Sequence, residues 1–284
     1  MSNAQRRKRV LRQHLKTEAL LGTEAVPRGD VVHVVDHDVD AVGDADTSSA
    51  TRPPAPTPSP TPAPTSAASR SPAAAPAGEP RPTVTESKPL DRKTKVRLLQ
   101  ALDENEVRGC TKCELCHGRT QTVFGEGDPD ADILFIGEGP GRDEDEQGRP
   151  FVGRSGALLT KMIEAMGLSR EQVFIANVVK CRPPNNRTPT PAEVATCWDY
   201  LRRQIETIQP KAIVTLGGPA AKAVLDTKEG ITKLRGTWHR YEGVSPPVPV
   251  MPTFHPAFVL RQYTKENRAR VWSDLQAVLK HVKG

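Results

Sequence analysis

From about residue 91 onward, short runs of apolar residues alternate with longer stretches in which apolar positions recur with helical spacing. Four runs are nearly continuous in apolar residues, as buried parallel strands are: 133–136, 173–179, 212–216 and 250–254. Helices are expected at 92–107, 155–166, 191–208, 218–225 and 267–281. This alternation predicts an α/β fold, a three-layer α/β/α sandwich with a central four-stranded parallel sheet.

The first 90 residues have a different pattern. Residues 51–89 are mostly Pro, Ala, Thr and Ser, so they cannot bury enough apolar surface to offset the entropy of ordering. An acidic stretch before them has the spacing of a calcium loop, but Ala41 stands where the loop needs glycine and Thr47 where it needs glutamate. The sequence predicts a disordered tail and linker over 1–90, followed by one folded domain over 91–284.

Charge and composition add little to this picture. The net charge of +6 is compatible with a polyanionic partner, but ordinary soluble proteins also carry such an excess. The chain has no apolar run of about 18 residues, and the basic residues 6–9 are not followed by the apolar core of an export signal. We therefore expect a cytoplasmic protein that does not enter a membrane.

Five cysteines in a reducing compartment favour ligation of a metal or cluster over disulfides. Cys110 and Cys113 form a CxxC pair that overlaps a second pair, Cys113 and Cys116, and Cys181 and Cys197 lie further on. Zinc ribbons usually combine two separate CxxC pairs, so this spacing favours an iron–sulfur cluster, with zinc as the weaker alternative. Spacing does not say which overlapping pair ligates, and buried apolar thiols remain the plain alternative, above all for Cys116.

A glycine-rich segment, GEGPG at 137–141, follows the first expected strand, and GRPFVG follows at 148–153. Glycines at the end of a parallel strand let backbone N–H groups approach a phosphate or a base. The segment does not fit a dinucleotide site, because a proline interrupts it and the next expected helix begins only at residue 155. It does not fit a phosphate loop either, since no Gly-Lys-Ser/Thr follows.

Together with these two motifs, Asn177 in IANVVKC and the segment FHPA at 254–257 resemble family 4 of the uracil-DNA glycosylases. The shorter motifs GRT, FGEG, KCRPP and RGTW add to the resemblance, which extends from about Cys110 to the last helix. It implies an enzyme of base excision repair that hydrolyses the N-glycosidic bond of uracil in single- or double-stranded DNA and leaves an abasic site. It also implies a monomer associated with the nucleoid of a bacterium or archaeon.

The resemblance further implies the ligand set. The first CxxC pair of that family aligns with Cys110 and Cys113, so these two residues, Cys181 and Cys197 would hold a [4Fe–4S] cluster. Cys116 would then be a bystander. The hydrolysis transfers no electron, so a structural role of the cluster is expected.

Cleavage of this bond requires a donor for the departing anionic base and a negative group near the sugar. By resemblance, His255 would donate a hydrogen bond to uracil O2, and Glu138 would direct or deprotonate the attacking water. A histidine before a proline is, on its own, more often a packing residue; the glycine-rich segment is what favours the catalytic interpretation.

The base must be flipped out of the DNA and held. By resemblance, Phe151 would stack on uracil, Asn177 would bind its N3 and O4 edge, and Gly139 would line the pocket. Glu144 would lie near C5 and exclude the methyl group of thymine. Without the resemblance, Phe151 would be assigned to the core and Asn177 to a hydrogen bond at a strand end.

Residues 257–261 are expected to enter the DNA, with Val259 or Leu260 as a wedge and Arg261 at a phosphate. The cysteine centre would present further basic residues to the DNA backbone, or these would be ordinary solvated charges: Lys180, Arg182 and Arg187.

Two alternatives remain open. One class of the same superfamily binds uracil-DNA covalently through a histidine in the loop that corresponds to 182–188, but this loop contains no histidine, so turnover is expected. The other alternative is a non-catalytic iron–sulfur module that binds DNA and leaves uracil intact. The proline-rich tail is expected to recruit an unidentified repair or replication protein.

Overall fold

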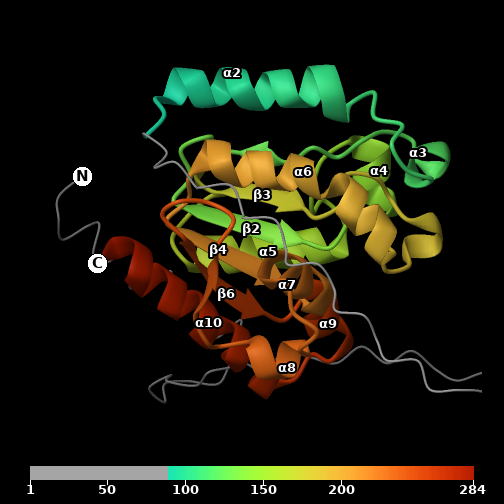
Figure 1. The fold of residues 1–284 in the computed structure, drawn as a ribbon. Helices are drawn as coiled ribbons and strands as arrows, with labels where there is room; N and C mark the ends of the chain where they lie inside the picture. The colour runs from blue at the N-terminus through green and yellow to red at the C-terminus, as the bar shows by residue number, and fades with distance from the viewer. Residues whose placement is uncertain (1–88) are drawn as a thin grey trace, which may run out of the picture. The chain divides into compact units, whose positions relative to one another are not determined.

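The computed structural model describes residues 89–284 (Figure 1). The tail predicted over 1–90 therefore lies, except for its last two residues, outside the described residues, and its boundary with the domain stays a prediction. Within the described range the strand order is β1-β3-β2-β4-β6-β5. The four central strands are parallel, which confirms the predicted sheet: β3 (Phe174–Asn177), β2 (Ile133–Gly137), β4 (Ala212–Leu216) and β6 (Val248–Thr253).

Two short strands that the sequence did not predict extend this sheet at its edges. β1 (Glu126–Gly127) pairs antiparallel with β3, and β5 (His239–Tyr241) pairs antiparallel with β6. Both are too short to show an apolar alternation, so the pattern of the sequence could not reveal them.

The sheet separates two hydrophobic cores. Successive residues of a strand point to opposite faces, so Leu134 and Ile136 join one core while Ile133 and Phe135 join the other. Three helices cover the first face: α2 (Arg92–Leu102), α6 (Pro191–Ile208) and α7 (Gly218–Leu225). The second face is covered by α5 (Arg154–Ala165), α9 (Pro256–Arg261) and α10 (Lys265–Lys283). This is the predicted three-layer sandwich, and Figure 1 shows α2 lying along α6 beyond β3.

The longer helices agree with the prediction to within a few residues, and a threonine cap marks the start of two of them. Thr190 accepts a hydrogen bond from the Glu193 N–H (3.3 Å) before Pro191 at the first helical position. Thr264 does the same for Asn267 (3.1 Å) at the start of α10. α2 ends earlier than predicted and continues as a π-helical turn (Asp103–Val107).

The short helices were not predicted: α3 (Leu115–Gly118), α4 (Arg142–Gln147), α8 (Ile231–Leu234) and α9. α4 matters most, because it begins directly after the glycine-rich segment, where no helix was expected before residue 155. Its sequence, RDEDEQ, has no apolar periodicity. Acidic residues in its first turn, Asp143, Glu144 and Asp145, instead favour the helix through its N-terminal dipole.

The loops that follow the four parallel strands meet at one edge of the sheet, where ligands of open α/β sheets bind. Between residues 89 and 284 no helix has the length and apolar character needed to cross a membrane.

Candidate active site

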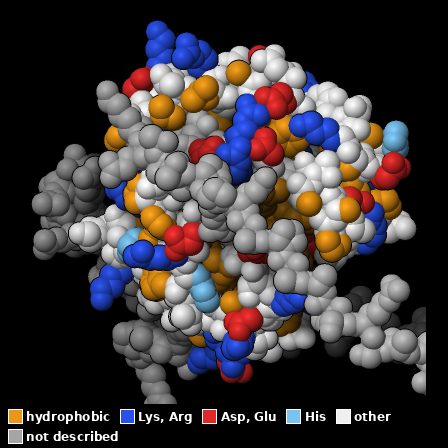
Figure 2. Space-filling view, viewed as in Figure 1, with side chains coloured by type: hydrophobic (Ala, Val, Ile, Leu, Met, Phe, Trp, Pro, Cys, Tyr) orange, Lys and Arg blue, Asp and Glu red, His pale blue; other side chains and the backbone are white. Residues whose placement is uncertain are grey.

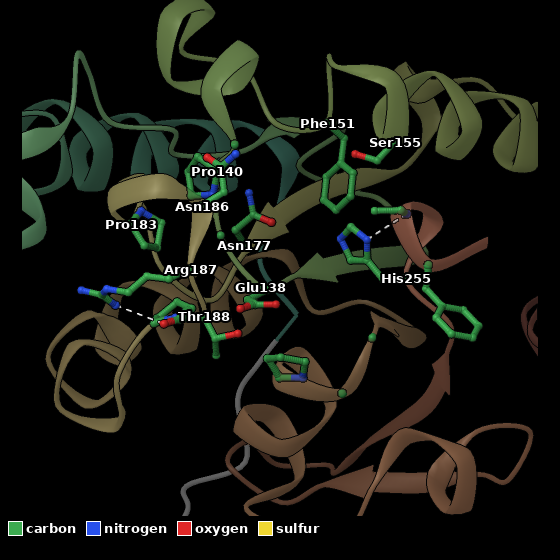
Figure 3. Close-up of a pocket in the computed structure, with 18 of the residues that line it drawn as sticks. Glu138, Pro140, Phe151, Ser155, Asn177, Pro183, Asn186, Arg187, Thr188 and His255 are labelled. Carbon is green, nitrogen blue, oxygen red and sulfur yellow. Dashed lines mark hydrogen bonds between the residues drawn. The ribbon is translucent and has the colours of Figure 1, made fainter. Parts of the chain in front are cut away.

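A cavity of about 530 Å³ opens at this edge of the sheet, lined by residues that follow each of the four parallel strands (Figure 3). The structure brings most of the predicted site residues into its wall: Glu138, Gly139, Glu144, Phe151, Asn177, Arg187, His255 and Arg261. Glu138 of the glycine-rich segment and His255, which are far apart in sequence, therefore line the same cavity, as the catalytic interpretation of both residues requires.

His255 lies between β6 and α9, and its Nδ1 caps α9 by accepting a hydrogen bond from the Ala257 N–H (3.1 Å). Burial, and to a lesser extent the charge of Arg261, lowers the pKa of His255 to about 4. The ring is therefore neutral at pH 7, with its proton on Nε2, which leaves one N–H donor. Gly217 has φ +92°, and a Cβ there would lie 3.0 Å from the His255 Cβ, so the imidazole packs against bare backbone.

Glu138 follows β2, and its backbone is fixed by the Val179 N–H, which donates to the Glu138 carbonyl oxygen (3.2 Å). Figure 3 shows its side chain between Thr188 and His255. Partial burial raises the pKa of the Glu138 carboxyl, and a hydrogen bond with Thr188 opposes part of this rise. A carboxylate with a raised pKa accepts a proton more readily, as a general base does.

Phe151 and Asn177 meet over Gly137, the last residue of β2. A Cβ at Gly137 would lie 2.5 Å from the Phe151 ring and 2.4 Å from Asn177 Oδ1, so no other residue fits there. The Phe151 and His255 ring centroids are 5.7 Å apart. Within residues 89–284, Asn177 Oδ1 is a buried acceptor with no hydrogen-bond partner. Such an atom costs about 1–3 kcal/mol, and a ligand that supplies a donor removes that cost.

Phe151 has φ +53°, a conformation that is unfavourable for a residue with a side chain. Arg170 holds it in place by donating to the carbonyl oxygens of Phe151 (3.0 Å) and Pro150 (2.7 Å), while an ion pair with Glu126 (2.7 Å) fixes the guanidinium. Arg170 was not among the residues predicted from the sequence, because nothing in its local pattern separates it from other basic residues.

Glu144 lies in the cavity wall, but its carboxylate already has backbone partners. One oxygen accepts from the N–H groups of Val152 and Gly153 (3.0 Å each), and the other accepts from Gly141 (3.1 Å). Glu144 thus ties the glycine-rich segment to the Phe151 loop, a structural role that the sequence did not predict. Its predicted position at C5 of the base stays a prediction.

A second, small cavity lies beside the first core and is lined by all five cysteines: Cys110, Cys113, Cys116, Cys181 and Cys197. The four predicted ligands thus come together from α6 and from loops far apart in sequence. In the described part of the chain, no three His, Cys, Asp or Glu side chains are grouped tightly enough to hold a single metal ion.

The surroundings of these thiols suit sulfur that carries charge. Arg119 Nη1 donates to Cys181 Sγ (3.1 Å), and the Lys180 N–H donates to Cys197 Sγ (3.3 Å). Burial raises the pKa of the Cys181 thiol, and it raises that of Cys197 to about 11. As free thiols, Cys181 and Cys197 would therefore be neutral. The N–H donors aimed at their sulfur atoms are the partners that a thiolate needs when it ligates a metal or cluster.

Lys180 is buried, so both interpretations of it, as a contact of the DNA backbone and as a solvated charge, were wrong. Its side chain is buried, and Nζ donates to the Asn177 carbonyl oxygen (2.9 Å) and to Gln204 Oε1 (2.6 Å). Burial lowers the pKa of Lys180 to about 8. A lysine that follows a strand of apolar residues can point inward, and only the fold shows that it does.

Val259 is fully buried in the second core, so it cannot serve as the wedge that the sequence proposed for Val259 or Leu260. Leu260 has 41% of its surface exposed and Arg261 is exposed beside it. Of the two wedge candidates only Leu260 is exposed, so its entry into DNA stays a prediction.

Arg182 and Arg187 lie in the loop that follows Cys181. Arg187 forms a two-pronged ion pair with Glu193 (2.7 and 2.8 Å), and Arg182 Nε donates to Asn186 Oδ1 (2.8 Å). Their contact with DNA stays a prediction. On the face shown in Figure 2, Lys and Arg side chains are interleaved with Asp and Glu and form no continuous basic stripe.

Comparison with known proteins gives a consistent result. Residues 124–276 match the model of the uracil DNA glycosylase superfamily. The chain is 47% identical to the type-4 uracil-DNA glycosylase of Thermotoga maritima over 67% of this chain and 97% of the relative. It is 51% identical to the type-4 enzyme of Sulfurisphaera tokodaii (55% of this chain, 74% of the relative) and 44% identical to that of Archaeoglobus fulgidus (63% and 92%).

Proposed function

Because this chain belongs to the uracil DNA glycosylase superfamily and is a uracil-DNA glycosylase, we propose that it flips uracil into the 530 Å³ cavity and hydrolyses its N-glycosidic bond there. The observation that carries this proposal is the unpaired, buried Asn177 Oδ1 beside Phe151. Uracil presents an N3–H donor to such an acceptor, whereas cytosine presents an acceptor at N3 and would leave both atoms unpaired. Phe151 would stack on the ring.

His255 stabilises the departing base. As the bond breaks, negative charge builds on uracil O2, and the Nε2–H donor of a neutral imidazole can hydrogen-bond to it. The pKa of about 4 keeps the imidazole neutral at working pH, so the proton stays on His255 and the base leaves as an anion. The Ala257 N–H holds Nδ1 and so fixes the tautomer.

Glu138 acts on the other reactant. Its carboxylate would accept a hydrogen bond from the attacking water, take up a proton as the new C–O bond forms, and offset the positive charge that develops on the sugar. The hydroxyl of Thr188 would orient the carboxylate. Hydrolysis then leaves free uracil and an abasic site.

The five thiols and the N–H···S hydrogen bonds fit an iron–sulfur cluster, with Cys110, Cys113, Cys181 and Cys197 as its ligands. When bound, the cluster would supply no electron to the hydrolysis and would cross-link the segment before β1 to the loop after β3. Replacement of Cys113 by Ser should remove the brown absorbance of the purified protein, whereas Cys116→Ser should retain it. Equal loss in both variants would contradict this ligand set.

An excision assay tests the function. The full chain is incubated with single-stranded oligonucleotides that contain one uracil, thymine or cytosine, and cleavage at the abasic site is measured after alkali treatment. We expect cleavage only at uracil. Intact uracil DNA that is nevertheless bound would favour the non-catalytic module, and an adduct stable to SDS would favour the covalent class.

A further inference from the structure

The turn between α9 and α10 carries an exposed aromatic side chain that the mechanism does not use. Tyr263 has 53% of its surface exposed, the largest exposed fraction among the large hydrophobic side chains of the described residues. Isolated tyrosines on a surface are common, so exposure alone says nothing about a ligand. The surroundings of this ring say more.

The turn is held rigidly. The buried Asn267 donates from Nδ2 to the Gln262 carbonyl oxygen (3.1 Å), and the Thr264 N–H donates to the same oxygen (2.8 Å). The Arg268 guanidinium lies over the Tyr263 ring, 4.5 Å from its centroid. One face of the ring is therefore supported by a cation before any ligand arrives, and a rigid ring loses little entropy when its other face is covered.

The position of the ring relates it to the cavity. Arg261 lines the cavity and is close enough to influence the pKa of His255. Tyr263 follows two residues later, so its Cα lies within roughly 7 Å of the Arg261 Cα at full chain extension. Exposed Leu260 is on the same short segment. A strand whose uracil occupies the cavity would pass this segment with its neighbouring nucleotide.

From this arrangement we propose that Tyr263, supported by Arg268, is a stacking platform for a nucleobase adjacent to the extruded uracil on the same strand. This inference rests on the proposed function, because it takes the cavity as the place of uracil. Arg261 and Lys265, both exposed, flank Tyr263 in the sequence and are available to meet the phosphates on either side of that base. An aromatic face between basic side chains is the usual composition of a site for single-stranded nucleic acid.

Binding without turnover tests the platform. Oligonucleotides with tetrahydrofuran in place of the uracil nucleotide cannot be cleaved, so their dissociation constants can be measured by fluorescence anisotropy with the full chain. One oligonucleotide keeps both flanking bases, a second lacks the base on the 5′ side, and a third lacks it on the 3′ side. For the wild-type protein, we expect one of the two deletions to weaken binding by about fivefold or more, the lower range for one aromatic–base stack.

Variants of Tyr263 test whether this side chain is the one that binds the flanking base. Tyr263→Ala should bind the complete oligonucleotide about fivefold more weakly than the wild type does. It should no longer distinguish the complete oligonucleotide from the one whose missing base weakens binding to the wild type. Tyr263→Phe should retain the discrimination, because it keeps the ring. Val96→Ala, which removes an exposed apolar side chain from α2, serves as the control and should behave as the wild type.

Three outcomes would overturn the platform: no discrimination by the wild type, full discrimination retained in Tyr263→Ala, or discrimination lost equally in Tyr263→Phe. Uracil excision is measured separately on the same proteins. Failure of excision with intact discrimination would contradict the proposed hydrolysis and leave only the binding of a flanking base by Tyr263, whereas normal excision without discrimination would contradict the platform and leave the proposed function intact.

Discussion

The cavity at the sheet edge is lined by Asn177 and the cysteine cavity by Lys180, three residues later, and the buried polar groups of the two differ in their partners. In the first, Asn177 Oδ1 is buried without a partner among the described residues. In the second, the buried Lys180 has both the Asn177 carbonyl oxygen and Gln204 as acceptors. The unpaired Asn177 side chain lines a cavity and can take a donor from a ligand, whereas the paired Lys180 supports the backbone. Asn177 belongs to both regions, through its side chain and its backbone respectively.

The largest loss of activity should come from replacement of Glu138, which lines the cavity at the sheet edge. Glu138→Gln keeps the shape of the side chain but removes the negative charge, so we expect kcat for uracil excision to fall by about 10²–10⁴-fold with the cluster absorbance unchanged. Glu242→Gln, at an exposed position, is the matched control. A loss of less than tenfold would assign the activation of water to another group.

The pH profile sharpens this prediction. Burial raises the pKa of Glu138, and the carboxylate must be ionised to accept a proton, so kcat should rise with pH through that raised pKa. The remaining activity of Glu138→Gln should lack this acidic limb. If the limb persists in the variant, a different group causes it.

His255 should have the next largest effect. His255→Ala removes the donor to O2, and loss of one such donor costs about 10²–10³-fold in kcat. The pKa of about 4 in the folded protein, against 6.5 for an ordinary histidine, also affects stability. Between these values the unfolded chain binds more protons at this site, so the stability contributed by neutral His255 is lost as pH falls from about 6.5 to 4.

Thermal unfolding measures this second effect. The difference in Tm between the wild type and His255→Asn should shift against the wild type as pH decreases through that window, because asparagine does not titrate. A Tm difference that is independent of pH would mean that the imidazole is not buried in its neutral form.

These residues show what sequence alone could provide. The four parallel strands and the long helices follow from apolar runs and from caps such as Thr190. Glu138 and His255 were proposed from short motifs that resemble a known family, and the fold brings both to one cavity although they are far apart in sequence. Lys180 was misplaced, because neither its charge nor its position after a strand says whether the side chain points inward. Arg170 was missed altogether, since its function depends on backbone oxygens that only the fold brings near.

Replacement of Lys180 tests whether its hydrogen bond to the Asn177 backbone supports the cavity at the sheet edge. Lys180→Met keeps the length of the side chain but leaves the Asn177 carbonyl oxygen without its donor, so we expect a loss of about 1–3 kcal/mol in the free energy of unfolding. Because Asn177 also carries the recognition side chain, KM for uracil DNA should rise while kcat changes less. Lys211→Met is the control, since Lys211 is exposed. An unchanged KM with lowered stability would mean that the two regions are independent.

The smallest of these effects should come from Arg170, which supports the cavity from outside. Arg170→Lys retains a cation for Glu126 but cannot donate to the Phe151 and Pro150 carbonyl oxygens in the same two-pronged way. Phe151 is then less firmly held at φ +53°, and the loss of about one hydrogen bond, near 1 kcal/mol, should raise KM about fivefold at constant kcat. Arg170→Met, which loses the ion pair as well, should also lower Tm. If the lysine variant loses stability without any change in KM, the guanidinium supports the fold and does not position the base-stacking ring.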